Sequence, residues 1–415
     1  MLEINVDQTL LKAKSLVKKG RLVEAKILYS KVLQAFPENK RAQKELIALN
    51  KPEQSTPAEG PPQDTIYQLI NLYNQGRLAD VVKLSHFLVE QYPTEFIVWN
   101  ILGAASKGLG RMVDATQAFK RVTELNPTYA DGFNNLGVAL KNQGKTDEAI
   151  VSYEKALLLK PDYAEAYNNI GIAVQEKGKL DEAIAYYEKA LSFKSDFAEA
   201  CNNMGIALKD QGKLDEAISS YEKALYLKPE YVDPHYNMGI VNQERGKLDE
   251  AIEFYEKTLL LEPVHAEAHQ NLGFALLSNG KLADGLKEYE WRWKTAENVN
   301  KKRQFAKPMW DGRTSLNGKK ILLWCEQGIG DTINWSSRIS LISSQADQCI
   351  LECQKKLVPL LTRSFPDIEV KVQDREKDAS RDDFDFHLPM GSLYQHFVSD
   401  ISANPKPVSF LSPDP

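Results

Sequence analysis

The chain has 415 residues, of which 43% are hydrophobic and 26% are charged, a composition ordinary for a soluble globular protein of two or three domains. Its 57 acidic and 52 basic residues give a net charge of −5 and are interleaved along the chain. This pattern argues against nucleic-acid binding, because nucleic-acid-binding proteins gather basic residues on one face.

Residues 1–50 predict a detached helical hairpin. Residues 6–39 place Ala13, Gly20, Ala25, Tyr29 and Pro37 at intervals that return further along the chain. The next stretch, KPEQSTPAEGPPQ, holds four prolines and no aromatic or branched aliphatic residue. Such a composition has no side chains with which to pack, so we predict a linker over 51–61.

Residues 130–265 contain four nearly identical copies of a 34-residue sequence. The motif GKTDEAI at Gly144 returns as GKLDEAI at Gly178, Gly212 and Gly246. Each copy holds two apolar stripes at helical spacing with a glycine between them. In 164–197 the spacing predicts one helix over about 164–176, a break at Gly178, and a second helix with Asp181 as a possible N-cap.

These residues resemble the tetratricopeptide repeat. Degenerate copies extend the frame in both directions, which gives seven contiguous repeats over 62–297 and predicts a mainly α fold, a right-handed α-solenoid. The last copy turns aromatic and basic in YEWRW, Tyr289 to Trp293, and these aromatic residues suggest docking onto the next domain of the chain.

The resemblance implies that the first helix of each repeat lines a concave groove, where polar positions form rows. Side-chain amides pair with peptide backbone irrespective of its sequence, so the rows predict a peptide-binding groove. The general repeat consensus also places asparagine in the second row, which leaves a structural role open. The first row is Asn134, Asn168, Asn202, Tyr236 and Gln270, and the second row is Asn135, Asn169, Asn203, Asn237 and Asn271.

After a connector over 298–317 the period disappears, and 318–415 alternates short β-type runs with helical ones. This order predicts a small, largely parallel α/β Rossmann-like lobe. The expected strands are 320–325, 348–353, 368–372 and 384–388, and the expected helices are 331–344, 355–364 and 391–400.

A glycine-rich turn comes after the first expected strand, in ILLWCEQGIGDT. Ligands of open α/β sheets bind beyond the carboxyl ends of strands, so Glu326, Gln327, Gly328 and Gly330 form a candidate acceptor or phosphate loop. The turn is not a dinucleotide fingerprint, because Ile333 stands where a third glycine is needed.

Residues 289–415 resemble bacterial proteins that join tetratricopeptide repeats to a heptosyltransferase-like domain. The resemblance rests on YEWR, WDG at Trp310, EQGIGD at Glu326, LVPL at Leu357 and PMGSL at Pro389. It implies that Asp331 is a general base toward a sugar hydroxyl, whereas the simpler interpretation is that Asp331 N-caps the next helix. Such enzymes need a second nucleotide-binding lobe, so we do not expect a complete transferase in this polypeptide alone.

The sequence predicts neither a metal site nor a cofactor. The six histidines show no paired ligand spacing, and Cys201, Cys325, Cys349 and Cys353 have neither CxxC spacing nor the density of a secreted disulfide scaffold. No segment is long and apolar enough to span a membrane or to act as a signal peptide. We therefore predict a cytoplasmic protein-interaction scaffold that holds a polypeptide. The alternative is a glycosyltransferase, or a fragment of one, that modifies a partner held by the repeats; the oligomeric state stays open.

Overall fold

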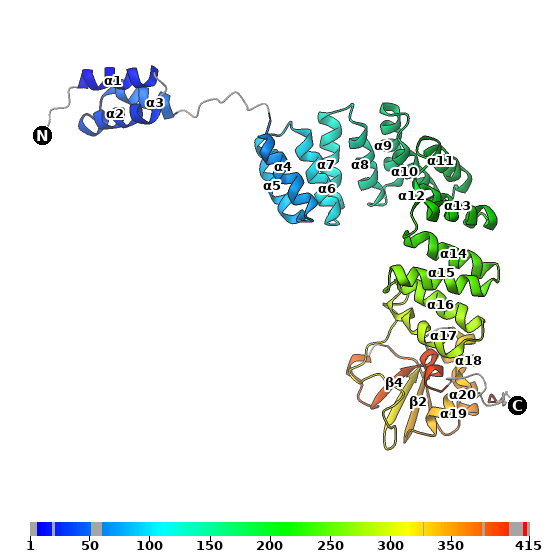
Figure 1. Cartoon of the computed structure of the whole chain (residues 1–415). Coiled ribbons are helices and arrows are strands. Elements are labelled where there is room, and N and C mark those ends of the chain that lie inside the picture. The colour runs from blue at the N-terminus through cyan, green and yellow to red at the C-terminus, as the bar shows by residue number, and fades with distance from the viewer. Residues whose placement is uncertain are drawn as a thin grey trace. The chain divides into compact units, whose positions relative to one another are not determined.

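The computed structural model describes residues 6–18, 21–50, 60–326, 328–375, 378–397 and 410–412 (Figure 1). It comprises two compact units, Met1–Lys160 and Pro161–Pro415. Across the described ranges, no helix combines the length and the apolar character that a bilayer-spanning segment needs.

The first unit begins with three helices around a small core of Ala13, Ala25 and Tyr29. A hairpin was expected from the sequence, and the third helix adds to it because Ala42, Leu46 and Leu49 pack on the same core. The predicted linker lies largely outside the described residues. The three helices are α1 (Val6–Lys18), α2 (Leu22–Ala35) and α3 (Lys40–Asn50).

Three antiparallel helix pairs complete the first unit. Their core includes Leu69, Val81, Val98 and Leu102. The helices are α4 (Gln63–Asn74), α5 (Leu78–Gln91), α6 (Phe96–Gly108), α7 (Met112–Leu125), α8 (Ala130–Lys141) and α9 (Thr146–Leu159).

The second unit begins with four more pairs, so each of the seven predicted repeats holds one helix pair. A 3-10 helix, η1 (Glu290–Lys294), ends the last pair. The pairs are α10 (Ala164–Glu176) with α11 (Leu180–Phe193), α12 (Ala198–Asp210) with α13 (Leu214–Leu227), α14 (Val232–Glu244) with α15 (Leu248–Leu261), and α16 (Ala266–Ser278) with α17 (Leu282–Tyr289).

Two glycines explain why each repeat folds into a pair. Gly178 has φ of 75° and ends α10 in a Schellman motif: its N–H donates to the Gln175 carbonyl at 2.8 Å, and Lys179 N–H donates to the Val174 carbonyl at 3.1 Å. A Cβ on Gly171 would lie 2.5 Å from the Tyr187 ring, so only glycine admits that ring. The second helix starts earlier than predicted: Lys179 holds the N-cap position without a side-chain cap bond, and Asp181 lies in the first turn.

The α/β lobe has a four-stranded parallel sheet in the order β3-β2-β1-β4. In its register, Leu322 pairs with Ile350 on one side and with His387 on the other. The strands agree with the predicted runs to within two residues at each end, because each is a short apolar segment between polar turns. They are β1 (Lys320–Trp324), β2 (Gln348–Cys353), β3 (Glu369–Val372) and β4 (Phe386–Pro389).

The helices of the lobe are shorter than predicted. The expected helix 331–344 is two helices, because the chain turns at Ser337 and Arg338. The expected helix 391–400 is replaced by 3-10 turns as far as residue 397, and residues 398–400 lie outside the described part. The elements are α18 (Ile329–Ser336), α19 (Ile339–Ser343), η2 (Lys355–Leu357), α20 (Val358–Ser364), η3 (Asp378–Ser380), η4 (Met390–Ser392) and η5 (Tyr394–His396).

The two faces of the sheet have different covers. Side chains alternate along a strand, so Ile321 and Leu323 face a core shared with α19 and α20. Leu322 and Trp324 face the other way and pack against Trp293 of η1. Residues 308–310 run beside β4, where Trp310 N–H donates to the His387 carbonyl at 2.9 Å. The end of the repeats and the residues after it thus cover the face of the sheet opposite α19 and α20.

Candidate functional site

The first helices of the second unit, α10, α12, α14 and α16, form one side of the stack. Successive first helices contact one another, α10 with α12, α12 with α14, and α14 with α16. Buried positions cover most of the circumference of each of these helices and leave one solvent-facing stripe. We call it the inner stripe. In α10 it consists of Glu165, Asn169, Ile172 and Glu176, and the equivalent positions recur in each later repeat.

The predicted asparagine rows meet between neighbouring first helices in hydrogen bonds that we call the amide ladder. Asn203 Nδ2 donates to Asn168 Oδ1 at 3.0 Å, and Asn237 Nδ2 donates to Asn202 Oδ1 at 3.0 Å. Asn271 Nδ2 donates to the Tyr236 hydroxyl, also at 3.0 Å. Each rung joins a second-row residue to the first-row residue one repeat earlier, so the rows fix the contact between repeats.

The first-row side chains are more enclosed than the sequence suggested, because Asn202 is only 2% exposed and Asn168 only 6%. Each rung nevertheless uses one group of each amide. Nδ2 of Asn168 and of Asn202 donates to no described residue and is not sealed from solvent. Oδ1 of Asn203 and of Asn237 is likewise without a described donor. These rungs therefore leave one donor and one acceptor each, which are the two groups that pair with a peptide unit.

The remaining row residues fall in the same register. In the first unit, Asn135 Nδ2 donates to Asn100 Oδ1 at 3.3 Å, and Asn134 is 8% exposed. In the second unit, Asn169 and Gln270 are half-buried. Within each unit, the predicted groove residues thus lie on first helices.

The predicted loop after β1 holds Gly328, Gly330 and Asp331 at the exposed start of α18, and Gln327 lies outside the described residues. Asp331 is not the N-cap, because Gly328 holds that position and no side chain caps the helix. Asp331 lies in the first turn, where a negative charge interacts favourably with the helix dipole. No described residue donates a hydrogen bond to its carboxylate.

Glu326, the first residue of the predicted loop, turns inward and binds Arg292. Arg292 Nε donates to Glu326 Oε1 and Nη2 donates to Oε2, both at 3.1 Å, and the two side chains are 2% and 3% exposed. Arg292 also donates to Ser392 Oγ at 2.8 Å and to Glu290 Oε1 at 2.6 Å. Glu326 lies just beyond the end of β1, after Cys325, and Ser392 lies just beyond β4, where the strand order reverses. Arg292 of the last repeat thus lies where open α/β sheets bind ligands.

Burial sets the protonation of Glu326, which shares the Arg292 guanidinium with Glu290. Burial raises the pKa of Glu326 to about 7, while Arg292 opposes the shift and Glu290 adds to it. The charged form of Glu326 is disfavoured, because the buried cluster holds two carboxylates and only one guanidinium. The stability of the docked lobe therefore depends on pH near neutrality.

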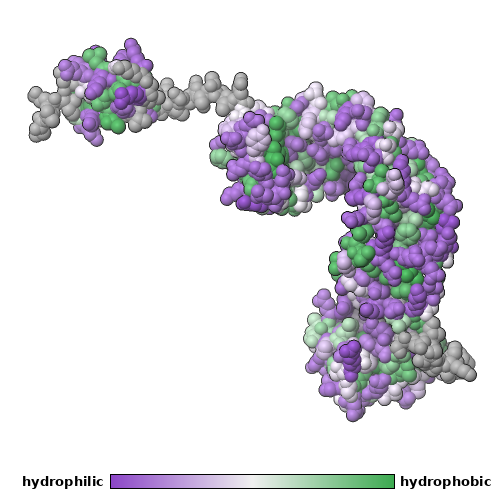
Figure 2. Space-filling view, viewed as in Figure 1, coloured by the Kyte–Doolittle hydropathy of each residue, from purple (hydrophilic) through white to green (hydrophobic). Residues whose placement is uncertain are grey.

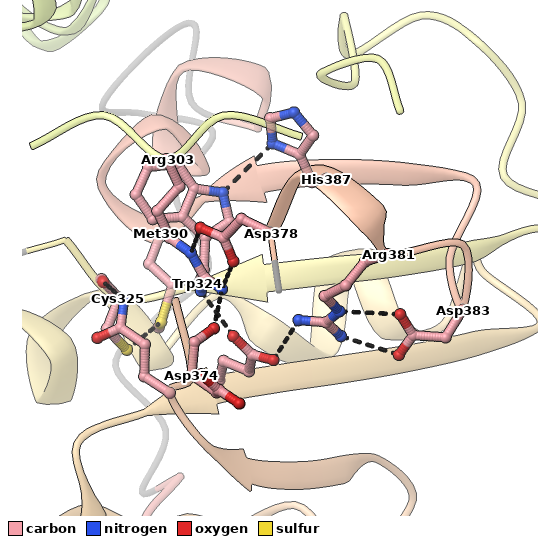
Figure 3. A network of polar contacts seen from close by, with 11 residues as sticks. Arg303, Trp324, Cys325, Asp374, Asp378, Arg381, Asp383, His387 and Met390 are labelled. Carbon is pink, nitrogen blue, oxygen red and sulfur yellow. Dashed lines mark hydrogen bonds and ion pairs between the residues drawn. The ribbon is translucent and has the colours of Figure 1, made fainter. Parts of the chain in front are cut away.

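A second buried network fixes residues after the last repeat onto the same face of the sheet (Figure 3). Arg303 donates to Asp378 Oδ2 at 2.8 Å, to Glu352 Oε2 at 2.6 Å and to the Asp374 carbonyl at 2.7 Å. Arg381 bridges the other oxygen of Glu352 to Asp383. Each charged group of these ion pairs faces a partner of opposite sign, so the network acts as a structural clamp.

His387 completes this side of the sheet as a neutral residue. Its Nδ1 accepts a hydrogen bond from Trp324 Nε1 at 3.3 Å. Burial, with Lys302 and Arg303 nearby, lowers the pKa of His387 to about 4. The ring thus stays uncharged at neutral pH and acts as a hydrogen-bond acceptor for the buried tryptophan.

Sequence reasoning did not find Arg292 and Arg303 as organising residues. A signal existed for Arg292, since it lies within the YEWRW motif that was expected to dock. No signal in the sequence pairs Arg303 with Glu352, because the two lie in different elements far apart along the chain. In the described chain no group of three His, Cys, Asp or Glu side chains comes together as a metal site, and all four cysteines are free and buried.

The stacked helix pairs define a solenoid, a class of repeat scaffold used for protein interaction. Its repeats are tetratricopeptide repeats. Models of that repeat match residues 118–151, 139–178, 164–197, 207–246 and 236–296.

Known proteins are similar to parts of this chain. Protein FlbA of Caulobacter vibrioides is 26% identical over 141 residues, which is 31% of this chain and 24% of FlbA. A chain of the APC/C hetero-tetramer Cut9–Hcn1 superimposes with a TM-score of 0.50 at 17% identity, over 72% of this chain and 55% of that one. The MamA structure gives a TM-score of 0.36 at 28% identity, over 40% of this chain and 98% of MamA. The chain thus spans about a quarter of FlbA and about half of the Cut9–Hcn1 chain.

Proposed function

We propose that the protein is a scaffold that binds an extended polypeptide segment along the inner stripe of its first helices, in a reducing cytoplasm. The amide ladder carries this proposal, because its asparagine rungs leave one donor and one acceptor each at regular spacing. A peptide backbone offers the complementary C=O and N–H groups in any sequence.

Apolar side chains on the inner stripe supply the second part of the binding surface. Ile172, Ile206 and Ile240 are half-buried, and Phe274 at the same position is 38% exposed. Figure 2 shows that hydrophilic residues predominate on the visible face of the repeats, with hydrophobic residues scattered among them. A peptide side chain placed on this row removes apolar surface from water at a cost of little reorganisation, since the helices are already packed.

The alternative, sugar transfer by the α/β lobe, has less support. Glu326 is bound to Arg292, and the crevice beyond β1 and β4 is filled. Asp331 is exposed, but no described side chain forms a hydrogen bond or ion pair with it, as the partner of a general base would. The lobe supports the end of the solenoid through Arg292 and Arg303, and this structural role accounts for its buried charges.

A peptide selection tests the proposed function. The probe is a phage-displayed library of random peptides of about 12 residues, long enough in extended form to pass several repeats. Enriched peptides are measured by fluorescence anisotropy against the full chain and an Asn168→Ala, Asn202→Ala variant. We expect the affinity to fall at least about tenfold, the effect of losing one or two hydrogen bonds.

The control must separate binding from stability, because the same substitutions remove two rungs. Tyr255→Phe deletes the bond from the Tyr255 hydroxyl to Gln243 Oε1, at 2.9 Å, and thus also removes a partly buried hydrogen bond. Equal affinity of the wild type and the asparagine variant, with a lowered melting temperature in both variants, would assign the rows to structure alone.

A further inference from the structure

The first helices of the second unit carry mostly acidic charged side chains. The four first helices of the second unit carry seven carboxylates and one lysine, Lys209. All seven flank the apolar row on the inner stripe in two lines, one at the start of each helix and one at its end. The first line is Glu165, Glu199, Asp233 and Glu267, and the second is Glu176, Asp210 and Glu244.

The first line is accessible and is only partly neutralised. The side chains of Glu165, Glu199 and Glu267 are 44%, 48% and 46% exposed. Lys194 Nζ lies 2.8 Å from Glu165 Oε1, and Lys228 Nζ lies 3.8 Å from Glu199 Oε1. In the next repeat the position of these lysines is taken by Glu262, so Asp233 has no such cation and the charge adds up over α14 and α16.

The second line behaves in the same way. Asp210 Oδ1 lies 3.2 Å from Lys209 Nζ and its side chain is 40% exposed, whereas Glu244 is exposed and forms no ion pair with a described residue. Glu267 of the first line lies 3.6 Å from the ring of His265, which is charged only when protonated. The end of the groove formed by α14 and α16 is therefore the most acidic part of the surface built by the first helices.

A separate observation, the state of two buried asparagines, points to a ligand between these charges. Between the two carboxylate lines lie Asn168 and Asn202, more than nine-tenths buried, each with an Nδ2 donor that has no described partner and still reaches solvent. A polar group held in that state loses free energy unless a ligand or water accepts its proton in a hydrogen bond. The carboxylates thus border a line of backbone-binding amides and an apolar row.

We propose that the polypeptide bound in this groove is a basic segment. This inference rests on the proposed function and specifies the charge of the partner. The segment lies extended, sets apolar side chains on Ile172, Ile206, Ile240 and Phe274, and directs Lys or Arg side chains to the carboxylates on either side. Its basic residues cluster where it passes α14 and α16. Opposite charge across a binding surface accelerates encounter and rejects acidic segments.

The test uses the same library of random peptides of about 12 residues, selected on the full chain at low salt. Enriched peptides are expected to carry more Lys and Arg than the starting library, and their dissociation constants are expected to rise steeply with sodium chloride. The groove variant is Asp233→Asn, Glu244→Gln, Glu267→Gln. It should bind roughly tenfold more weakly, the combined effect of three exposed ion pairs.

A matched control carries the same change of charge elsewhere. Glu188→Gln, Glu222→Gln, Glu256→Gln alters one exposed position in three successive second helices, α11, α13 and α15. It should bind like the wild type, because those helices lie outside the groove. Equal weakening in both variants would mean that only the overall charge matters and would overturn the inference.

Two further results have distinct meanings. Peptides that depend on Asn168 and Asn202 but are neutral or acidic would overturn the basic partner and leave the proposed groove function intact. Peptides that bind the wild type, the asparagine variant and the carboxylate variant with equal affinity would overturn both proposals.

Discussion

Arg292→Met offers a direct test of how the last repeat holds the α/β lobe. The substitution keeps the apolar stem of the side chain and removes its bonds to Glu326, Glu290 and Ser392. Glu326, which is 3% exposed, would then be left without a cation in a buried place. Removing one partner of a buried ion pair costs about 3–5 kcal/mol of unfolding free energy, because the remaining charge is uncompensated.

The pH decides how much of that cost appears. The pKa of Glu326 in the folded wild type is about 7, above its ordinary value of 4.5, so the folded state binds this proton more tightly than the unfolded state does. The stability from this group is thus greatest below pH 4.5 and is lost as the pH rises through 7. Without Arg292, which lowers this pKa, the proton is held more tightly still. The cost should therefore shrink to about 1–3 kcal/mol at acidic pH, where Glu326 is neutral.

Urea unfolding at about pH 5.5 and about pH 8 measures this difference. Tryptophan fluorescence is a suitable signal, because the ring centroids of Trp293 and Trp324 lie 5.6 Å apart beside the junction. The double variant Arg292→Met, Glu326→Gln removes the stranded charge and should recover most of the loss at pH 8. The reasoning is refuted if the loss is equal at both pH values and the double variant shows no recovery.

Single contacts give three further predictions. Tyr187→Phe removes the bond from the Tyr187 hydroxyl to Gln175 Oε1 and should lower the free energy of unfolding in urea by about 1 kcal/mol. Tyr221→Phe removes a buried hydroxyl that has no partner in the described chain, so it should be neutral or stabilising. Equal losses in both variants would show that the two hydroxyls do not differ. Gly171→Ala sets a methyl 2.5 Å from the Tyr187 ring and should cost about 1–3 kcal/mol, and an unchanged midpoint would show that the ring moves freely. Asp331→Ala should cost less than about 1 kcal/mol, since Asp331 interacts with the helix dipole and caps nothing; a nucleotide-sugar assay in which the wild type turns over and the variant does not would contradict the scaffold.

The repeats were predictable because their recurring residues are each required by the local structure. Gly178 is needed for the left-handed turn, and Gly171 is needed for the Tyr187 ring, so the same letters return in every regular repeat. The strands of the lobe were predictable for a similar reason, since Ile321–Trp324 is a short apolar run between polar turns. The early end of helix α18 was not predicted, because the turn at Ser337 and Arg338 contains no glycine or proline to indicate it.

The candidate sites were harder to predict, because they depend on long-range pairing. The sequence places Asn168 and Asn203 in rows, but only the stacking of two repeats shows that they bond to each other and bury the first row. Glu326 looked like a loop residue because it comes after a strand and next to glycines. Its inward direction is set by Arg292, and that partner belongs to the end of the last repeat.

Site-specific photo-crosslinking tests the central claim most directly. A photoreactive amino acid replaces Ile206 on the inner stripe or, as the control, Tyr226 on α13, which is 86% exposed. With an enriched basic peptide as the probe, position 206 should form the peptide adduct and position 226 should not. Adducts from position 226 with none from position 206 would place the peptide outside the groove and contradict the account.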